Sequence, residues 1–369
     1  MLTYPIKIEG LKGVGSVELS FQEDQQVFAL IGANGIGKTK TLEALFQVLI
    51  FSHKYLRSID DVHLASDIWV LREIVSKNIS FKVPTKNISS QYINQFVDPI
   101  INLHSLPVVF LASQNRGFIQ HSDKPSTTIN TLENRRSNYF KSLFFNMKDK
   151  FSSLNMDVNI EQWFITLAQS SNPYQKSEDN REIEIKVVLG LLNKIDPRID
   201  SNFMQISGDG RVALRIDGQL RELSQLSTGF ASILKILQAI ISGYSYFTNE
   251  SRLQQVKGFV LIDEIESHLH LAWQAKIIPL LKQLFPNTTF YITTHSSVVL
   301  SPLKDGEAYR LERDADGVVR TKEIKSPSKA SLVDVLKDAF DIDVNQIKLE
   351  NTLPSDQQVA KQQLLDLLG

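Results

Sequence analysis

Residues 27–51 read VFALIGANGIGKTKTLEALFQVLIF, two apolar runs joined by a glycine-rich segment. The first run, VFALI, is short and wholly apolar, which is typical of a strand buried on both faces. The second run carries its apolar residues at helical spacing. Between them, residues 32–39 read GANGIGKT and match the pattern G-x-x-x-x-G-K-[ST] in full. This stretch predicts an α/β fold built around a phosphate-binding loop.

The residues of this loop have distinct roles in binding a nucleoside triphosphate. Glycines let successive backbone N–H groups converge on phosphate oxygens, and the helix that follows adds the partial positive charge of its N-terminus. We expect Lys38 to place a cation on the β- and γ-phosphate oxygens and the Thr39 hydroxyl to bind Mg²⁺. The predicted nucleotide-binding residues of the loop are Asn34, Gly35, Ile36, Gly37, Lys38, Thr39 and Lys40.

Two further apolar strands are predicted to end in catalytic side chains. FVLIDE (259–264) ends in two carboxylates, of which Asp263 is expected to hold Mg²⁺ and Glu264 to orient the attacking water as a base. YITTHS (291–296) ends in His295, which is expected to sense the γ-phosphate and to hydrogen-bond Glu264 or the attacking water. The expected catalytic residues are therefore Lys38, Glu264 and His295.

A second candidate anion site precedes another helix. Residues 226–230 read LSTGF, and they place the Ser227 hydroxyl and the Gly229 N–H at a helix N-terminus. A serine in this position alone is mostly a helix cap, so both interpretations stay open on the residues themselves.

Taken in order, the phosphate loop, the LSTGF segment, the acidic strand and the histidine resemble the motif set of ABC-type ATPases. More narrowly, DEIESHLH (263–270) followed by WQAKIIPLLKQLFPNTTFYITTHSSVVLS (273–301) is similar to the ATPase domain of the OLD, RecF and SMC-like group. The chain looks most like the stand-alone "AAA family" ATPases of bacterial antiphage systems such as Septu and the retron-associated ATPases. The resemblance covers residues 1–51 and 205–310 well and the middle only loosely.

The resemblance implies a dimer in which two chains sandwich two nucleotides. Ser227 and Gly229 of one chain would then contact the γ-phosphate bound by the other, and the loop 266–268 would cross the dimer interface. The segment departs from the common form at Thr228 and Phe230, where glycine and glutamine are usual.

Two more site residues follow from the resemblance. Gln114, at the end of the strand LPVVFLAS (106–113), matches a glutamine loop that reaches Mg²⁺, with a surface-loop glutamine as the alternative. The implied metal-binding set is Thr39, Asp263 and Gln114. Lys12 stands where this group often has a basic residue near the adenine base.

The expected organisation is an ABC-ATPase-like head with an inserted helical subdomain. Its central sheet should be mostly parallel, with added N-terminal antiparallel strands. The predicted parts are an N-terminal lobe (1–51), a mainly helical insertion (52–204) that includes the strand 106–114, a C-terminal lobe (205–310), and a terminal hairpin with helices (311–369). Within them we expect helices around 60–77, 90–104 and 357–369.

Composition narrows the possible functions. The chain has 369 residues and no cysteine, which excludes a disulfide scaffold, a thiol nucleophile and an iron–sulfur cluster. Forty basic against forty-one acidic residues give a formal charge of −1, so no overall field attracts nucleic acid or anionic membrane. The start lacks a signal peptide and no run is long enough for a membrane span, so a cytoplasmic location without membrane association is expected.

Several weaker patterns have a structural and a functional interpretation. The cluster of Arg135, Arg136, Lys141, Lys148 and Lys150 could line a nucleic-acid groove, although a solvated helix face is favoured. Trp163 and Phe164 favour helix packing over base stacking. Asp314 and Asp316 favour a hairpin turn over a nuclease Asp-x-Asp pair.

Together these features predict an ATPase that binds ATP and Mg²⁺, forms a homodimer or higher homo-oligomer, and acts as a switch for a separate effector protein, expected to be a nuclease. The antiphage role rests on the family resemblance. The alternatives are a RecF-like DNA-repair ATPase and, less favoured, the ATPase subunit of a transporter. Nucleic acid stays open as a partner.

Overall fold

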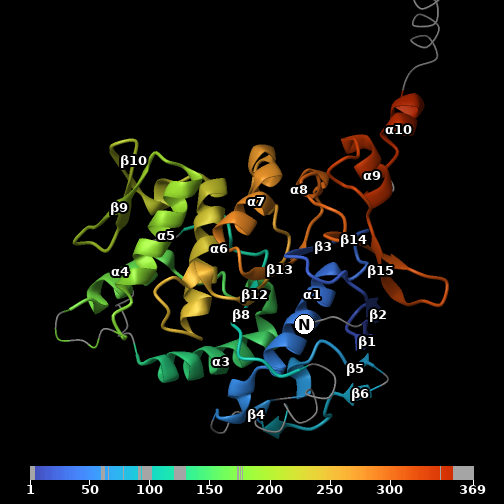
Figure 1. Ribbon diagram of the computed structural model, residues 1–369, viewed down its shortest axis with the longest axis horizontal. Coiled ribbons are helices and arrows are strands. Elements are labelled where there is room, and N and C mark those ends of the chain that lie inside the picture. Colours follow the sequence, from blue (N-terminus) through green and yellow to red (C-terminus); the bar gives the residue numbers. More distant parts are fainter. Residues whose placement is uncertain are drawn as a thin grey trace, which may run out of the picture.

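The computed structural model describes residues 5–59, 63, 64, 66–77, 79–89, 93, 102–119, 130–172, 174, 176, 178–340 and 342–351. Its main feature is a large mixed sheet with helices around it (Figure 1). In spatial order the strands are β6 (Ile79–Lys82), β5 (Glu73–Ser76), β1 (Ile6–Leu11), β2 (Gly15–Leu19), β15 (Val319–Glu323), β14 (Ala308–Arg313), β3 (Val27–Ile31), β13 (Thr288–Thr293), β12 (Gly258–Ile262) and β8 (Val108–Leu111).

The two ends of this sheet differ in strand direction. Strands β14, β3, β13, β12 and β8 run parallel to one another. Strands β2, β1, β5 and β6 form an antiparallel series. Every residue of β3, β12 and β8 is buried, as expected for parallel strands covered on both faces. The predicted mostly parallel sheet with N-terminal antiparallel strands is therefore confirmed.

Helices cover the sheet and build a separate helical region beside β8. The helices are α1 (Lys38–Phe51), α3 (Leu132–Asp149), α4 (Ile160–Ser170), α5 (Glu182–Ile195), α6 (Thr228–Ser245), α7 (Leu271–Leu284), α8 (Ser297–Leu300), α9 (Leu332–Phe340) and α10 (Val344–Asn351). Helix α1 contacts β13 and β8, while α6 contacts β8 and α5. Helices α3 to α6 thus extend from one edge of the sheet, with the antiparallel strands toward the other (Figure 1).

Two small sheets complete the described part. Strands β9 (Ile199–Ile206), β10 (Val212–Ile216) and β11 (Gln219–Glu222) form the antiparallel strands predicted over 204–224. Strands β4 (His63–Leu64) and β7 (Ile88–Ser89) pair with each other.

The prediction of a helix around residues 60–77 is wrong. Its described residues contain β4, a short 3₁₀ turn (Ser66–Ile68) and β5. In β5 the residues EIVS alternate between half-buried and buried, and Val75 pairs with Lys7 of β1. This two-residue period is that of a strand with one face on the core. The helices predicted over 90–104 and 357–369 fall almost entirely, or entirely, outside the described residues.

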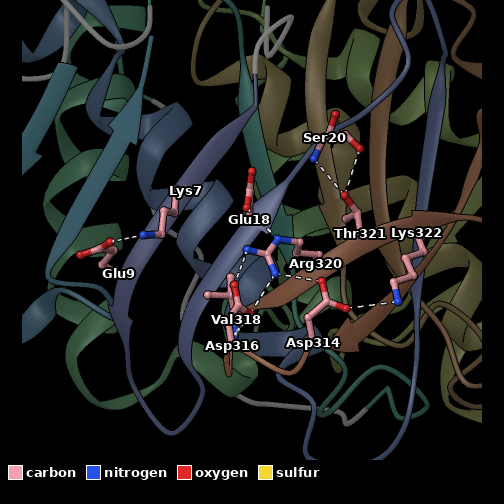
Figure 2. A network of polar contacts seen from close by, with 10 residues as sticks. All are labelled: Lys7, Glu9, Glu18, Ser20, Asp314, Asp316, Val318, Arg320, Thr321 and Lys322. Carbon is pink, nitrogen blue, oxygen red and sulfur yellow. Dashed lines mark hydrogen bonds and ion pairs between the residues drawn. The ribbon is translucent and has the colours of Figure 1, made fainter. Parts of the chain in front are cut away.

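The hairpin β14–β15 resolves the question of Asp314 and Asp316. The Asp314 N–H donates to the Val318 carbonyl and the Gly317 N–H donates to the Asp314 carbonyl, closing a turn. Arg320 binds both aspartates and Glu18 of β2 at 2.7–2.9 Å (Figure 2). The two carboxylates are therefore ion-pair partners across a turn, as the sequence favoured. Every helix in the described part of the chain is too short or too polar to cross a bilayer.

Candidate nucleotide-binding and active site

The phosphate loop lies between β3 and α1 in a conformation that only glycine permits at its end. Gly37 has φ 107° and is the N-cap of α1. A Cβ at Gly37 would lie 2.5 Å from Cγ2 of Val14, so a larger residue would collide with the β1–β2 hairpin. Asn34 and Gly35 are exposed, Ile36 is half-buried, and the loop opens toward solvent there.

Lys38 is buried and its amine crosses the loop. Its Nζ donates to the Gly32 carbonyl at 2.8 Å and to the Ala33 carbonyl at 3.1 Å. Burial lowers the pKa of Lys38, while the nearby carboxylates of Glu264, Glu266 and Asp263 act in the opposite direction. The next lysine, Lys40, points elsewhere and pairs with the buried Glu43 at 2.6 Å.

A hydroxyl–carboxylate cluster joins the phosphate loop to the acidic strand. Thr39 Oγ1 donates to Asp263 Oδ1 at 3.0 Å, and Thr293 Oγ1 at the end of β13 donates to the same oxygen at 2.6 Å. Asp263 is 4% exposed, and burial raises the pKa of its carboxyl group. Hydroxyl and carboxylate oxygens are the hard ligands that Mg²⁺ prefers, so Thr39 and Asp263 fit the metal-binding role predicted for them.

Glu264 has a strained backbone conformation held by several hydrogen bonds. Its φ is 45°, in the left-handed region that a residue with a Cβ rarely adopts. Its N–H donates to Thr293 Oγ1 at 2.8 Å, and its Oε2 accepts from Ser267 Oγ at 3.2 Å. Such conformations persist only where surrounding contacts impose them, and they concentrate at functional sites.

Arg116, whose role no sequence motif indicates, binds the main chain of this segment. Its side chain is fully buried and donates to the main-chain oxygens of Asp263 at 2.8 Å, Glu264 at 2.9 Å and Ala112 at 2.7 Å. Burial lowers the pKa of Arg116 to about 10, so the group is still cationic near neutral pH. In the sequence, the only sign of this role is that Arg116 is a charged residue in the turn directly after the buried strand β8.

Gln114 lies in the same turn, after β8, and is exposed. The neighbouring residue Asn115 has φ 60°, and its carbonyl accepts from Lys235 Nζ of α6 at 2.5 Å. The turn therefore contacts both the acidic strand, through Arg116, and α6, through Lys235. The proximity of Gln114 to the Mg²⁺ ligands stays a prediction.

His295 is attached to the site through Glu266 in this structure. The His295 N–H and the Thr294 hydroxyl each donate to one oxygen of the Glu266 carboxylate, both at 2.6 Å. The His295 residue itself is exposed. Glu266, predicted only as part of the interface loop, thus connects the turn after β12 to the end of β13.

Ser227 and Gly229 begin α6. Ser227 is exposed and caps the helix by accepting from the Phe230 N–H at 3.3 Å. A Cβ at Gly229 would lie 3.4 Å from the His268 carbonyl, and Ser232 Oγ donates to the Ser267 carbonyl at 3.2 Å. The N-terminal end of α6 and the loop after β12 are therefore packed together.

The nucleic-acid groove considered for the basic cluster does not form from its arginines, and the buried Arg135 also departs from the solvated helix face that the sequence favoured. Arg135 is 9% exposed and bonds Asn249 Oδ1, while Arg136 donates to the Phe247 carbonyl at 2.7 Å. Lys148 pairs with Asp67 at 2.8 Å. Lys12 Nζ donates to the Asp67 carbonyl at 3.2 Å, which places this lysine against the 66–68 turn.

Comparison with known proteins agrees with these features. A family model described as "AAA domain, putative AbiEii toxin, Type IV TA system" matches residues 27–301. The chain is similar to "Septu protein PtuA" of Bacillus thuringiensis, with 24% identity over 330 residues that cover 85% of this chain and 77% of that one.

Two further matches are more limited. "Retron Ec83 probable ATPase" of Escherichia coli is 35% identical over 104 residues, which are 26% of this chain and 19% of that one. Among solved structures, "Crystal structure of the SmcHead bound to the C-winged helix domain of ScpA" aligns with a TM-score of 0.47 and 14% identity, covering 88% of this chain and 99% of that one.

Proposed function

Because the chain belongs to the family of AAA-domain ATPases that its residues 27–301 match, we propose that it works as a Mg²⁺-dependent, ATP-driven dimeric switch. The observation that carries this proposal is the contact between Thr39 and Asp263. These residues are 224 positions apart in sequence, yet their side chains lie 3.0 Å apart, with Lys38 beside them. A phosphate loop and a carboxylate brought together in this way can hold a metal–triphosphate complex.

In the proposed mechanism each residue has one task. Mg²⁺, when bound, supplies positive charge that stabilises the phosphate oxygens during transfer. Thr39 and Asp263 would hold it, Lys38 would bind phosphate oxygens, and Glu264 would accept a proton from the attacking water. Arg116 would fix the position of Glu264 through the main chain.

The dimeric part of the proposal rests on the exposed N-terminus of α6. Ser227 lies at the positive end of this helix, where an anion is favoured. It would meet the γ-phosphate bound by a second copy. The packing of α6 against the loop 266–268 supports a closure in which the interface and the catalytic turn move together.

We further propose that the switch acts in antiphage defence through a separate effector protein, with a nuclease as the expected class. The support is the similarity to proteins named for the Septu and retron systems. The RecF-like alternative is less favoured, since Arg135 and Arg136 of the basic cluster donate to oxygens inside the protein.

The test of the ATPase proposal is nucleotide binding and phosphate release by the purified full chain. Lys38→Ala should lower ATP affinity and turnover by about 100-fold or more, since it removes the cation among the phosphates. Removing Mg²⁺ with a chelator should abolish turnover of the wild type. The matched control is Lys54→Ala, an exposed lysine beyond the end of α1, which should behave as wild type. Equal ATP affinity in wild type and Lys38→Ala would contradict the proposed site.

A further inference from the structure

A cavity of about 610 Å³ opens in the helical region, and its walls share no residue with the nucleotide site described above. Its lining residues come from helices α3, α4, α5 and α6, whose positions Figure 1 shows, from Tyr246 just after α6, and from residues 130, 150, 153–155 and 157–159. Its volume is within the range of small-molecule sites, about 300–1,000 Å³.

The walls are rich in groups that hydrogen-bond a polar heterocycle. Amide side chains line it from Asn138 and Asn146 on α3, from Asn155, and from Gln162 on α4. Trp163 adds a half-buried aromatic face. Amides combined with an aromatic face can stack on a planar base and bind its mixed donors and acceptors.

Tyr139 and Tyr246 close another part of the wall as a stacked pair, with ring centroids 4.6 Å apart. This pair is rigid, because Tyr139 belongs to the core of α3 and is 7% exposed. A ligand would therefore meet a preformed surface on this side.

Most charged groups of the cavity wall already have partners inside the protein. Its carboxylates already have internal partners: Glu184 pairs with Arg181 at 2.8 Å, and Asp157 accepts from Asn115 and Ser153, both at 2.6 Å. Arg135 is nine-tenths buried and likewise has a partner inside the protein, since it donates to Asn249 Oδ1.

Lys150, at the end of α3, is exposed and lines the same cavity. Because the other charged groups of the wall already have partners inside the protein, the Lys150 ammonium is the cation suited to a phosphate group.

We propose that this cavity is a second nucleotide site. It would take a heterocyclic base that carries a phosphate, supplied either as a free mononucleotide or as one nucleotide of a single strand. The base would stack on Trp163 and bond the amide walls, and the phosphate would face Lys150.

One turn connects this cavity to the ATP site. Asp157 in the cavity wall accepts from Asn115 Nδ2 at 2.6 Å. The next residue, Arg116, holds the main-chain oxygens of Asp263 and Glu264. Lys235 of α6 donates to the carbonyls of Asn115 and of Met156, beside Asp157. A ligand that orders the wall at Asp157 would therefore order the turn that supports Glu264, and we expect it to raise kcat.

Binding is tested by calorimetry on the Lys38→Ala chain, in which the phosphate loop no longer competes for the probe. The probes are the four ribonucleoside 5′-monophosphates and, separately, a ten-nucleotide single strand carrying a 5′-phosphate. We expect one bound probe per chain. Binding of a monophosphate identifies the free nucleotide as the source, and binding of the oligonucleotide alone identifies the strand. Absence of binding by every probe at millimolar concentration overturns the proposal.

Substitutions in the cavity wall test whether the probe binds in this cavity. Ser142→Trp, at an exposed position of α3 in the wall, should fill the cavity and weaken binding at least tenfold. The matched control, Ser152→Trp, lies at an exposed position outside the lining and should leave affinity unchanged. Lys150→Gln should weaken binding, whereas Lys141→Gln, also exposed on α3 and outside the lining, should not. Affinity equal in Ser142→Trp and Ser152→Trp, both folded by thermal melting, contradicts a site in this cavity.

Coupling between the cavity and the ATP site is measured separately, as the change in kcat of the wild-type chain at saturating ATP. We expect the bound probe to raise kcat about fivefold or more, the lower end of ordinary coupling free energies. Asn115→Gly tolerates the positive φ of this position and removes the side chain that donates to Asp157. It should still bind the probe while losing the rise in kcat. If the probe leaves kcat of the wild type unchanged, the proposed coupling between the cavity and the ATP site is wrong. The calorimetric test of binding does not depend on ATP turnover and is judged separately.

Discussion

Glu264 combines a strained backbone with a carboxylate at the end of a buried strand. Its φ of 45° is stabilised by Thr293, Ser267 and Arg116, none of which is adjacent to it in sequence. A cost of about 1–3 kcal/mol is typical of such conformations, and several hydrogen bonds can offset it. The arrangement fixes where the carboxylate points before any nucleotide binds.

Glu264→Gln should separate ATP binding from hydrolysis. The amide keeps the shape and the hydrogen bond from Ser267 but cannot accept a proton from water. We expect turnover to fall by about 10²–10⁴-fold, with ATP affinity retained, in a phosphate-release assay paired with nucleotide binding. The control Glu250→Gln, at an exposed position beyond α6, should match the wild type. Undiminished turnover would exclude Glu264 as the base.

Arg116→Lys tests whether the buried guanidinium is a positioning residue. Lysine keeps the charge but cannot donate in a fixed fork to the carbonyls of Ala112, Asp263 and Glu264 together. We expect kcat to fall about tenfold or more while KM for ATP changes little, because the phosphate loop is untouched. A purely structural role would lower the melting temperature and leave kcat of the folded enzyme unchanged.

Among the secondary-structure elements, the buried His53 connects the end of α1 to the segment before β8. His53 is 3% exposed, accepts from the Tyr55 N–H at 3.1 Å, and packs edge-on against His104 with ring centroids 5.5 Å apart. Burial lowers the pKa of His53 to about 3, with the nearby His104 and Arg136 adding to the shift. The folded state therefore holds this ring neutral.

This histidine predicts a pH dependence of stability. In the unfolded chain the pKa of His53 is near 6.5. Below that pH the imidazole is protonated in the unfolded state but stays neutral in the folded state. The stabilisation is complete above about pH 6.5 and is lost as the pH falls toward 3, at up to about 1.4 kcal/mol per pH unit. Chemical denaturation between pH 7 and 4.5 should show a shallower decline for His53→Asn, which keeps an acceptor for Tyr55. Parallel pH profiles for the two chains would contradict this account.

The strands around the site could be predicted from sequence because each is a continuous apolar run. VFALI and FVLI are buried on both faces, and the loop motif needs only local residues. Strand β5 could not be predicted in this way, since EIVS is short and its strand character comes from pairing with β1. For a related reason Arg116 was missed as a site residue, and Glu266 was predicted only as part of the interface loop. Their partners are mainly main-chain groups of strands distant in sequence, which no local pattern reports.

At the scale of the whole molecule, the proposed switch needs two chains. Each chain carries both a phosphate loop and Ser227 at the start of α6. In a two-fold dimer, the phosphate loop of each chain would face Ser227 of the other chain. Ser227 also caps α6, so its substitution is expected to cost about 1 kcal/mol of stability in addition to any effect on the partner site.

The measurement that tests the composite site most directly is ATP hydrolysis by a mixture of two inactive variants. Lys38→Ala lacks the loop cation but keeps Ser227, whereas Ser227→Arg keeps the loop and lacks the serine. A mixed dimer pairs one intact loop with one intact serine. An equal mixture that re-equilibrates should therefore recover about a quarter of the wild-type rate, since half of the dimers are mixed and each has one intact site of two. A rate that stays at the sum of the two variants, although mixed dimers are detected by native mass spectrometry, would contradict a site shared between chains.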